Sequence, residues 1–390
     1  MSIKWAKRIE TLPPYLFAEI DAKKQEMRVK GIDLIDLGVG DPDIPTPRNI
    51  IDALKRAVED PTNHRYPSYE GMPAFREAAA NWYKERFGVN VDYMREVVTL
   101  IGSKEGIAHA PLAFVDPGDI VLVPDPGYPV YSVATGFAGG IPYLMPLLKE
   151  NDFLPDLDAI PEDIRRKARL MFINYPNNPT SAVADKGFFK KVVDFALKYG
   201  ILVCHDAAYT EVAFDGFNPP SFLEVDGAKE VGMEFHSLSK TFNMTGWRIG
   251  FAAGNQKAIS GLGKIKTNID SGVFQAIQIA GMEGLKNYSL GMSERRKIYE
   301  DRRNVFCRGL DEIGIKYYPP KATFYVWFEV PARVSSKEFT EKLLTEAGIV
   351  VTPGIGFGKY GEGYIRVSIT IGKERLIEAV ERLKNVRFKI

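Results

Sequence analysis

The chain has 390 residues, of which 45% are hydrophobic and 26% are charged. This is the composition of an ordinary globular protein, and the length suffices for two or three domains. Lys and Arg number 51 against 50 Asp and Glu, a net charge of +1. Because nucleic-acid binders usually carry a marked basic excess, we expect no nucleic-acid partner.

The start of the chain and its two cysteines indicate a cellular location. Residues 1–20 lack the continuous apolar stretch and small-residue cleavage site of a secretory signal, and no run approaches the roughly 18 apolar residues of a membrane span. Cys204 and Cys307 are far apart and have neither disulfide nor zinc spacing. We therefore expect a cytoplasmic protein with no membrane partner, in which Cys204 is a buried free thiol.

Helix and strand signals alternate through most of the chain. Apolar runs bounded by Gly, Pro and Asn predict strands, and longer periodic segments, often ending on glycine, predict helices. Helices are predicted at 14–30, 73–88, 104–115 and 186–200. Strands are predicted at 32–40, 96–102, within 119–131, within 168–180, at 201–209 and at 248–254.

The pattern changes near residue 285. A long helix is predicted at 287–314, followed by strands at 322–330 and 363–369 and helices at 336–348 and 373–386. Short apolar strands separated by helices indicate an α/β fold with a mostly parallel sheet covered by helices on both faces. We predict a large α/β domain at 46–284, a small α+β domain at 285–390, and an arm at 1–45 that joins the small domain.

Polar residues stand near the ends of the predicted strands, where α/β sheets bind ligands. Asn178 lies in a Pro-rich turn, where its amide can point out of the sheet. Asp206 ends an apolar strand, and a buried carboxylate there needs a partner such as a cationic ligand nitrogen. Tyr209 can offer a phenol to the same ligand. Taken singly, a turn amide and a helix-capping aspartate are simpler explanations.

The segment 237–248 combines a lysine with groups that suit a phosphate. Lys240 can form a Schiff base with an aldehyde when its surroundings lower its pKa. Ser237, Ser239 and Arg248 supply hydrogen-bond donors for a phosphate. The run "GSKEGI" places Ser103 at a predicted helix start, whose free N–H groups favour the same anion, although taken alone a plain N-cap at Ser103 is the simpler explanation.

In combination, "NYPNNPT", "HDAAY" and "SLSKTFNMTGWRIG" resemble the fold type I pyridoxal-phosphate enzymes, specifically the class I and II aminotransferases. The resemblance covers nearly the whole chain. It implies pyridoxal 5′-phosphate as the cofactor, Lys240 as the Schiff-base lysine and proton carrier, and Asp206 as the partner of the ring nitrogen. It also implies that Asn178 and Tyr209 bind the phenolic oxygen of the ring.

The resemblance implies roles for further residues. Tyr128 matches the aromatic that stacks on the ring, Arg366 the arginine that binds the substrate α-carboxylate, and Gly38 a backbone contact to that carboxylate. Tyr66 matches a tyrosine that reaches the phosphate in the partner subunit, which implies a homodimer with shared active sites. The phosphate site corresponds to Ser103, Lys104, Ser237, Ser239 and Arg248.

The implied reaction is ping-pong transamination between an amino acid and a 2-oxo acid, with no metal. Within the family, "IGSKEGIAH" and "LGVGDPDIPTP" look most like the LL-diaminopimelate aminotransferase group, which implies 2-oxoglutarate and lysine biosynthesis. Aminotransferases for alanine, aspartate or glutamate and a β-lyase of the same fold remain alternatives. Candidates for binding the distal end of diaminopimelate, besides Asn178 and Tyr128 nearer the ring, are Tyr69, Glu70, Lys104, Asp270 and Ser271.

Two other classes fit the chain less well. A cofactor-sensing transcription factor needs an additional DNA-binding domain, for which the two predicted domains leave no room. A dinucleotide-binding dehydrogenase needs G-x-G-x-x-G after its first strand, and "DLGVGDPD" has only G-x-G.

Overall fold

The computed structural model describes residues 3–10, 12, 16–331 and 333–386. Its largest element is a seven-stranded sheet with the order β2-β8-β7-β6-β5-β3-β4. Only β8 runs antiparallel to its neighbours, so the sheet is mostly parallel, as predicted. The strands are β2 (Val97–Leu100), β3 (Ile120–Asp125), β4 (Ile141–Pro146), β5 (Ala168–Asn174), β6 (Leu202–Asp206), β7 (Gly232–Ser237) and β8 (Gly250–Gly254).

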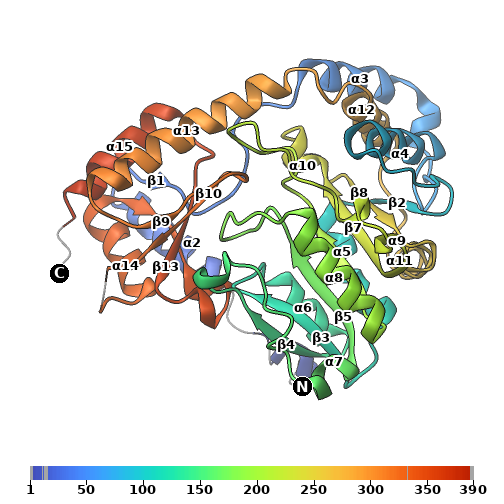
Figure 1. The fold of residues 1–390 in the computed structure, drawn as a ribbon. Helices are drawn as coiled ribbons and strands as arrows, with labels where there is room; N and C mark the ends of the chain where they lie inside the picture. Colours follow the sequence, from blue (N-terminus) through green and yellow to red (C-terminus); the bar gives the residue numbers. More distant parts are fainter. Residues whose placement is uncertain (1–2, 11, 13–15, 332, 387–390) are drawn as a thin grey trace.

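Helices cover both faces of this sheet, as Figure 1 shows. On one face, α4 (Pro73–Phe87), α8 (Lys186–Tyr199) and α12 (Gln275–Lys286) pack in the largest hydrophobic core. On the other face, α5 (Ser103–Phe114), α6 (Val130–Phe137) and α11 (Gln256–Ile269) contribute to a separate core. Alternate strand residues divide between the two cores: Val203 joins the first and Cys204 the second. The predicted buried thiol at Cys204 is confirmed.

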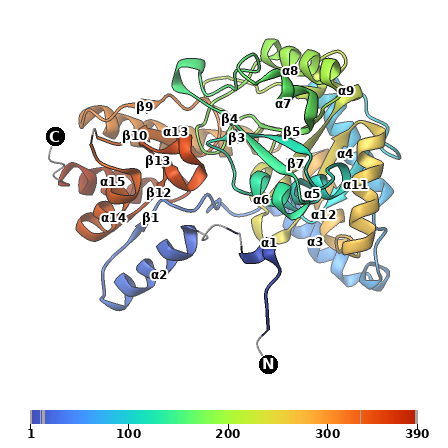
Figure 2. The same cartoon turned by 90° about the horizontal axis from the view of Figure 1, so that it is seen from below.

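A second, smaller sheet has four antiparallel strands in the order β12-β13-β10-β9. Figure 2 shows it, with its helices, on the opposite side of the molecule from the large sheet. The strands are β9 (Tyr317–Tyr318), β10 (Tyr325–Glu329), β12 (Thr352–Pro353) and β13 (Tyr364–Ser368). The helices are α13 (Met292–Glu312), α14 (Ser336–Lys342) and α15 (Lys373–Lys384).

The N-terminal segment joins this smaller part of the molecule. Strand β1 (Ile35–Asp36) pairs in parallel with β11 (Ile349–Val350). Helix α2 (Leu16–Val29) lies beside α14, and Lys23 of α2 forms an ion pair with Glu341. The helix predicted at 14–30 is observed at Leu16–Val29. Residues 14 and 15 lie outside the described residues. Shorter helices complete the chain: α1 (Lys7–Glu10), α3 (Arg48–Glu59), α7 (Glu162–Lys167), α9 (Ala228–Val231) and α10 (Leu238–Thr241).

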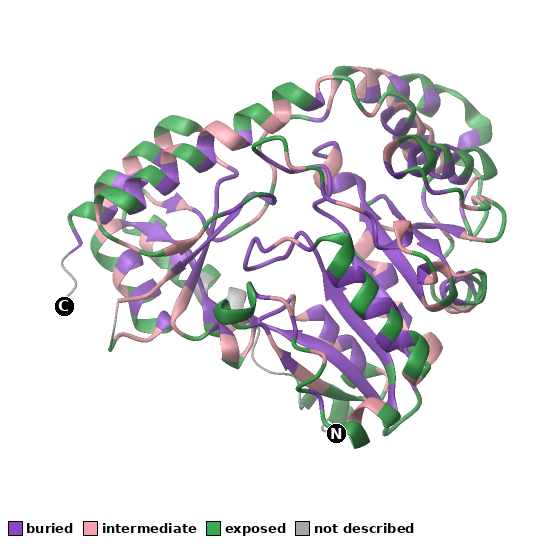
Figure 3. Ribbon diagram, viewed as in Figure 1, coloured by how far each residue is buried: buried purple, intermediate pink, exposed green. Residues whose placement is uncertain are grey.

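Some predicted boundaries are wrong. The helix predicted at 287–314 begins only at Met292, because Gly291 before it has a φ of +64°, which is not helical. The strand predicted at 32–40 is only two residues long, and the strand predicted at 248–254 begins at Gly250 because Arg248 has a φ of +55°. Strands β4 and β7 were not predicted at all. Figure 3 shows the strands of the large sheet buried beneath helices with exposed outer faces.

Among the described residues, no helix combines the length and the apolar character that a membrane crossing requires.

Candidate active site

A cavity of about 490 Å³ lies where the carboxyl ends of β6 and β7 face the smaller sheet. It also receives the loop after β1 and the start of α5. The structure thus brings together residues that are widely separated in the sequence. The predicted site residues that line it are Gly38, Ser103, Lys104, Tyr128, Asn178, Asp206, Tyr209, Ser237, Ser239, Lys240, Arg248 and Arg366.

Lys240 lies in the single turn of α10, directly after β7, and its amine donates a hydrogen bond to the carbonyl oxygen of Gly40 at 3.0 Å. Burial lowers the pKa of Lys240 to about 8; the charges of Arg248 and Arg366 act in the same direction, whereas nearby carboxylates oppose them. An ammonium group with a pKa near 8 is partly neutral at physiological pH. Lys240 is therefore available as a nucleophile and as a base.

Asp206 is the last residue of β6, and only one of its two carboxylate oxygens accepts a hydrogen bond from a side chain. The Tyr131 hydroxyl donates a hydrogen bond to Oδ2 at 2.9 Å, while Oδ1 is buried and has no hydrogen-bond partner. Burial raises the pKa of the Asp206 carboxyl. A buried acceptor that faces the cavity suits a cationic N–H of a ligand. Tyr131 was not predicted, although it stands three residues after Tyr128 on the first turn of a helix.

A phosphate-sized anion has a cradle at the start of α5. Gly102, with a φ of +75°, precedes Ser103, and a Cβ on Gly102 would lie 2.3 Å from an Arg248 nitrogen. Arg248 Nη1 donates to the Thr245 carbonyl at 2.9 Å and lies 3.5 Å from the Ser239 hydroxyl. The free N–H groups of a helix start and a neighbouring guanidinium form a site for a dianion.

Arg366 projects from β13 on the opposite wall of the cavity. Its Nη1 donates to Asn178 Oδ1 at 2.9 Å, and its Nη2 donates to the Gly38 carbonyl at 2.6 Å. The guanidinium lies over the Tyr325 ring at 4.3 Å, and its Nε is buried with no partner. A guanidinium whose plane is fixed in this way is suited to a planar carboxylate.

Two tyrosines complete the wall between Lys240 and Arg366. The hydroxyls of Tyr209 and Tyr325 are 3.1 Å apart. The Tyr128 ring packs edge-to-face on Tyr131, with ring centroids 6.0 Å apart, and the Lys104 amine lies 5.7 Å from the Tyr128 ring. Tyr325 is a further lining residue that was not predicted. It lies within an apolar strand whose sequence gives no sign of a site.

Five of the residues predicted from the sequence do not line this cavity. Tyr66 is 89% exposed and Tyr69 is 48% exposed. Glu70 lies 3.4 Å from Arg76, with which it forms an ion pair. The remaining two are Asp270, which pairs with Lys266 at 2.9 Å, and the exposed Ser271.

These five residues nevertheless belong to one region. A Cβ on Gly272 would lie 2.9 Å from the Ser68 carbonyl, so the turn that contains Asp270 packs on the loop that contains Tyr69. This loop and this turn contribute no residue to the lining of the cavity in their own chain.

A buried ion pair in the N-terminal segment lines the cavity and was not predicted. Lys24 lies 2.6 Å from Asp36 and 3.0 Å from Asp21. Although burial lowers the pKa of Lys24, these two carboxylates raise it by more. Lysine and aspartate on an N-terminal helix normally form its solvated face, so nothing in the sequence distinguishes this group.

The fold and the site together define an enzyme of the pyridoxal-phosphate type. A lysine with a lowered pKa suits an aldehyde, a buried carboxylate with a free oxygen suits a cationic ring nitrogen, and a helix start with an arginine suits a phosphate. Comparisons with known proteins give the family. The profile of the aminotransferase class I and II family matches residues 32–383. The chain belongs to this family; it is an aminotransferase, and its cofactor is pyridoxal 5′-phosphate.

Individual relatives agree over the full length. The chain is 58% identical to an LL-diaminopimelate aminotransferase of Syntrophobacter fumaroxidans, with 100% of both chains covered. It is 56% identical to one of Aquifex aeolicus, covering 98% of this chain and 99% of the other. A solved structure of substrate-bound BacF from Bacillus subtilis is 41% identical, with a TM-score of 0.95 and coverage of 100% and 99%.

Proposed function

We propose that this aminotransferase moves the amino group of LL-2,6-diaminopimelate to 2-oxoglutarate in lysine biosynthesis. The observation that carries the catalytic part is the meeting of Lys240, Asp206 and Arg366 in one cavity. The substrate rests on the names of relatives that are 54–58% identical over nearly the whole chain. The names of these relatives favour diaminopimelate over alanine, aspartate or glutamate as the amino donor, and favour amino-group transfer over the β-lyase reaction.

The cavity residues divide the work of holding the cofactor. Bound pyridoxal 5′-phosphate supplies an aldehyde that captures an amino group and a cationic ring that accepts the electrons of a broken Cα–H bond. Asp206 holds the ring nitrogen through its unpaired Oδ1, and Asn178 and Tyr209 hold the phenolic oxygen. Tyr128 covers a face of the ring. The phosphate is held by Ser103, Lys104, Ser237, Ser239 and Arg248.

Two residues act on the substrate. Arg366 binds the α-carboxylate, helped by the backbone of Gly38, and thereby orients the Cα–H bond. Lys240 removes the α-proton as its neutral amine and later delivers it as an ammonium group. Its pKa of about 8 suits both directions, because the neutral and charged forms are both populated near neutral pH.

We also propose a cytoplasmic homodimer with shared active sites. The exposure of Tyr66, Tyr69 and Glu70 outside the cavity of their own chain supports this proposal, since such residues are free to complete the site of a second copy. In this arrangement Tyr66 reaches the phosphate of the other subunit, and Tyr69 and Glu70 reach the distal end of the substrate. We propose the domain boundaries 1–45, 46–284 and 285–390 for this assembly.

One assay tests the substrate. Purified enzyme is mixed with 2-oxoglutarate and a panel of amino donors that contains LL-diaminopimelate, alanine and aspartate, and the glutamate formed is measured. We expect diaminopimelate to be the best donor. Activity with alanine or aspartate and none with diaminopimelate would overturn the proposed substrate, and release of ammonia and pyruvate would indicate a β-lyase.

A further inference from the structure

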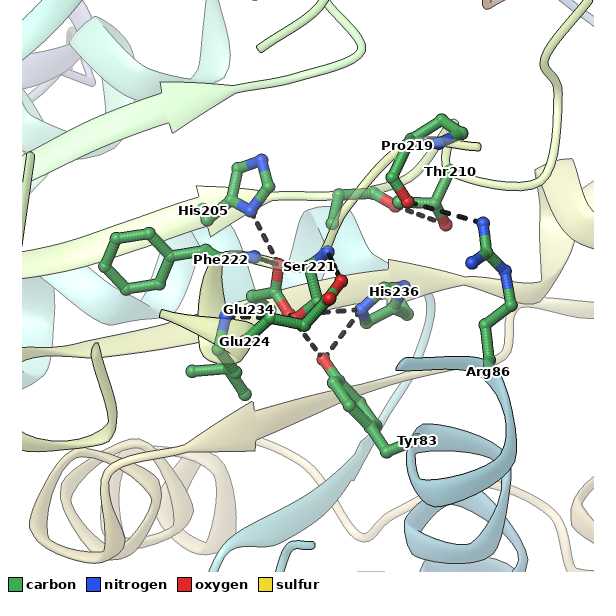
Figure 4. A network of polar contacts seen from close by, with 12 residues as sticks. Tyr83, Arg86, His205, Thr210, Pro219, Ser221, Phe222, Glu224, Glu234 and His236 are labelled. Atoms are coloured by element: carbon green, nitrogen blue, oxygen red, sulfur yellow. Dashed lines mark hydrogen bonds and ion pairs between the residues drawn. The ribbon is translucent and has the colours of Figure 1, made fainter. Parts of the chain in front are cut away.

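A buried cluster of polar side chains surrounds Glu234 in the large sheet (Figure 4), on the face opposite Asp206. His205 immediately precedes Asp206 in β6, and adjacent residues of a strand point to opposite faces. Around His205 are Glu234 and His236 of β7 and Tyr83 of α4, and none of these side chains is more than 3% exposed. The cluster therefore lies directly behind the cofactor site but does not touch the cavity.

Glu234 is the anion of this cluster. Its Oε1 accepts hydrogen bonds from the His205 ring at 2.7 Å and from the Phe222 amide at 2.9 Å. Its Oε2 accepts from the Tyr83 hydroxyl at 2.9 Å and from the Ser221 hydroxyl. Burial alone would raise the pKa of Glu234, but the hydrogen bond from His205 and the proximity of His236, 3.8 Å away, hold it below its ordinary value. A carboxylate with four donors is ionised.

His205 lies against this carboxylate. Its Nδ1 faces the Glu234 carboxylate, and its Nε2 lies 2.9 Å from the Tyr175 carbonyl oxygen. The Tyr175 backbone N–H also points at Nε2, from 3.3 Å, and would donate to it only if that nitrogen carried no proton. The nearest partner of each ring nitrogen is thus an acceptor, and an imidazole that donates from both nitrogens carries a positive charge.

His205 connects this ion pair to the two polar residues at the strand ends. Along β6 it is bonded to Asp206, and through the Tyr175 carbonyl it holds the start of the turn that carries Asn178. The Asn174 side chain joins the same ends, because it donates to the Asp206 carbonyl at 2.7 Å and accepts from the Asn178 amide at 2.8 Å.

The charge of the cluster acts on Asp206. Burial, the largest influence, raises the pKa of the Asp206 carboxyl, and the hydrogen bond from Tyr131 and the charges of His205 and His236 oppose that rise. Stability gives no sufficient reason for the cluster, since a buried ion pair contributes little net stability compared with apolar side chains of the same size.

We propose that His205 is a positioning residue of the active site, held as an imidazolium by Glu234 so that the Asp206 carboxylate on the other face of the sheet stays ionised. The inference rests on the proposed role of Asp206 as the partner of the ring nitrogen. The new element is that His205 maintains the negative charge of the Asp206 carboxylate.

Other titratable groups also face this pair, and each enters the pH dependence. The groups near His205 are Glu234 and His236 of β7 and Tyr83 of α4; Tyr175 contacts His205 only through its backbone, and its hydroxyl donates to the Phe153 carbonyl. The groups near Asp206 are Tyr131 of α6, Tyr209 and Lys240.

A first experiment observes His205 directly. The chain contains four histidines, so the spectrum of a ¹⁵N-histidine-labelled protein is simple enough to assign with Gln variants of His64, His109 and His236. At a pH of about 8, above the ordinary titration range of histidine, we expect the His205 ring to retain both protons. The measurement itself is made on the wild-type protein, whose cluster is intact. A neutral His205 ring at that pH would overturn the proposal.

A second experiment measures the effect on the site. The apoenzyme is titrated with two aldehyde-free analogues of the cofactor, one with the ring nitrogen and one with C–H in its place. Both analogues carry the same phosphate, so the ratio of their affinities reports only the effect of the ring nitrogen. In the wild type, acidification should reduce the preference for the nitrogen analogue as Asp206 takes up a proton. In His205→Gln, this loss should occur about one pH unit higher, a tenfold effect on the acid side.

Ser221→Ala is the matched control, because it removes another donor to Glu234 and keeps the histidine charge. It should melt at a lower temperature yet keep the wild-type pH midpoint. An identical midpoint in His205→Gln and the wild type would overturn the role of His205. If the wild type does not prefer the nitrogen analogue at any pH, the proposed role of Asp206 fails instead.

Discussion

The two faces of strands β6 and β7 each carry a buried carboxylate, and the two carboxylates differ in how many hydrogen bonds they accept. On the cavity face, Asp206 keeps an oxygen without a partner, although it is buried. On the opposite face, both oxygens of Glu234 have two donors each. Because an unsatisfied buried acceptor is costly, it marks the place where a ligand supplies the missing partner. On one face the protein itself satisfies the buried carboxylate, and on the other face it leaves an acceptor for a ligand.

The largest effect should come from the cavity face. Lys240→Ala removes the amine that captures the aldehyde and moves the α-proton, so we expect a loss of at least about 10³-fold in the rate of transamination. Borohydride reduction followed by peptide mapping checks the attachment: cofactor mass should appear on Lys240 in the wild type and on no peptide of the variant. Lys104→Ala, which keeps the amine of Lys240, should retain the label. A labelled lysine elsewhere in the chain would contradict the assignment.

A smaller loss should follow from the carboxylate itself. Asp206→Asn preserves shape and removes the charge that faces the ring nitrogen, and we expect activity to fall by about 10²-fold, the low end of what one positioned ionised group contributes. Tyr131→Phe is the paired control, because it removes only one hydrogen bond to the same carboxylate. It should cost about tenfold or less. Equal losses in the two variants would show that the charge of Asp206 is not what matters.

The pH dependence of aldehyde capture refines the comparison further. Only the neutral amine attacks an aldehyde, so the rate at which the apoenzyme captures the cofactor should rise with pH through about 8, the pKa of Lys240, and then level off. Arg366→Gln removes one of the positive charges that lower this pKa. The midpoint should therefore move upward in that variant, which stopped-flow absorbance at several pH values will measure. A downward shift would contradict the electrostatic account.

On the opposite face, loss of a neutral donor to Glu234 should affect stability rather than rate. Tyr83→Phe removes the hydroxyl that donates to Glu234 and lies 2.7 Å from the His236 ring. We expect the free energy of unfolding to fall by about 1–3 kcal/mol, with kcat close to that of the wild type. Urea denaturation followed by circular dichroism gives the first quantity and the glutamate assay gives the second. A large loss of kcat without loss of stability would reverse the assignment of the two faces.

The sequence was sufficient for the parts of the site that local patterns mark. A lysine between serines, an aspartate that ends an apolar run and an asparagine in a Pro-rich turn each have a recognisable context, and the structure places all three in one cavity. Helix α4 was likewise predicted, because Gly88 ends it in the left-handed conformation.

The remaining residues are positioned by contacts between distant parts of the chain. Tyr131 reaches Asp206 across 75 positions, and Lys240 reaches the carbonyl of Gly40 across 200. The buried Lys24 pair depends on α2 lying over the cavity. No periodicity or spacing encodes such contacts, since they arise only when the sheet and the N-terminal segment pack together.

The pairing of β1 with β11 has a consequence for the order in which the protein matures on the ribosome. Ile35 is synthesised 314 residues before its strand partner, Ile349. All seven strands of the large sheet, with Lys240 and Asp206, are synthesised before that partner exists. Because distant segments close slowly, the N-terminal strand waits unpaired while the sheet assembles behind it. The cavity cannot be complete until this late part of the chain has been made, because Arg366 follows β11.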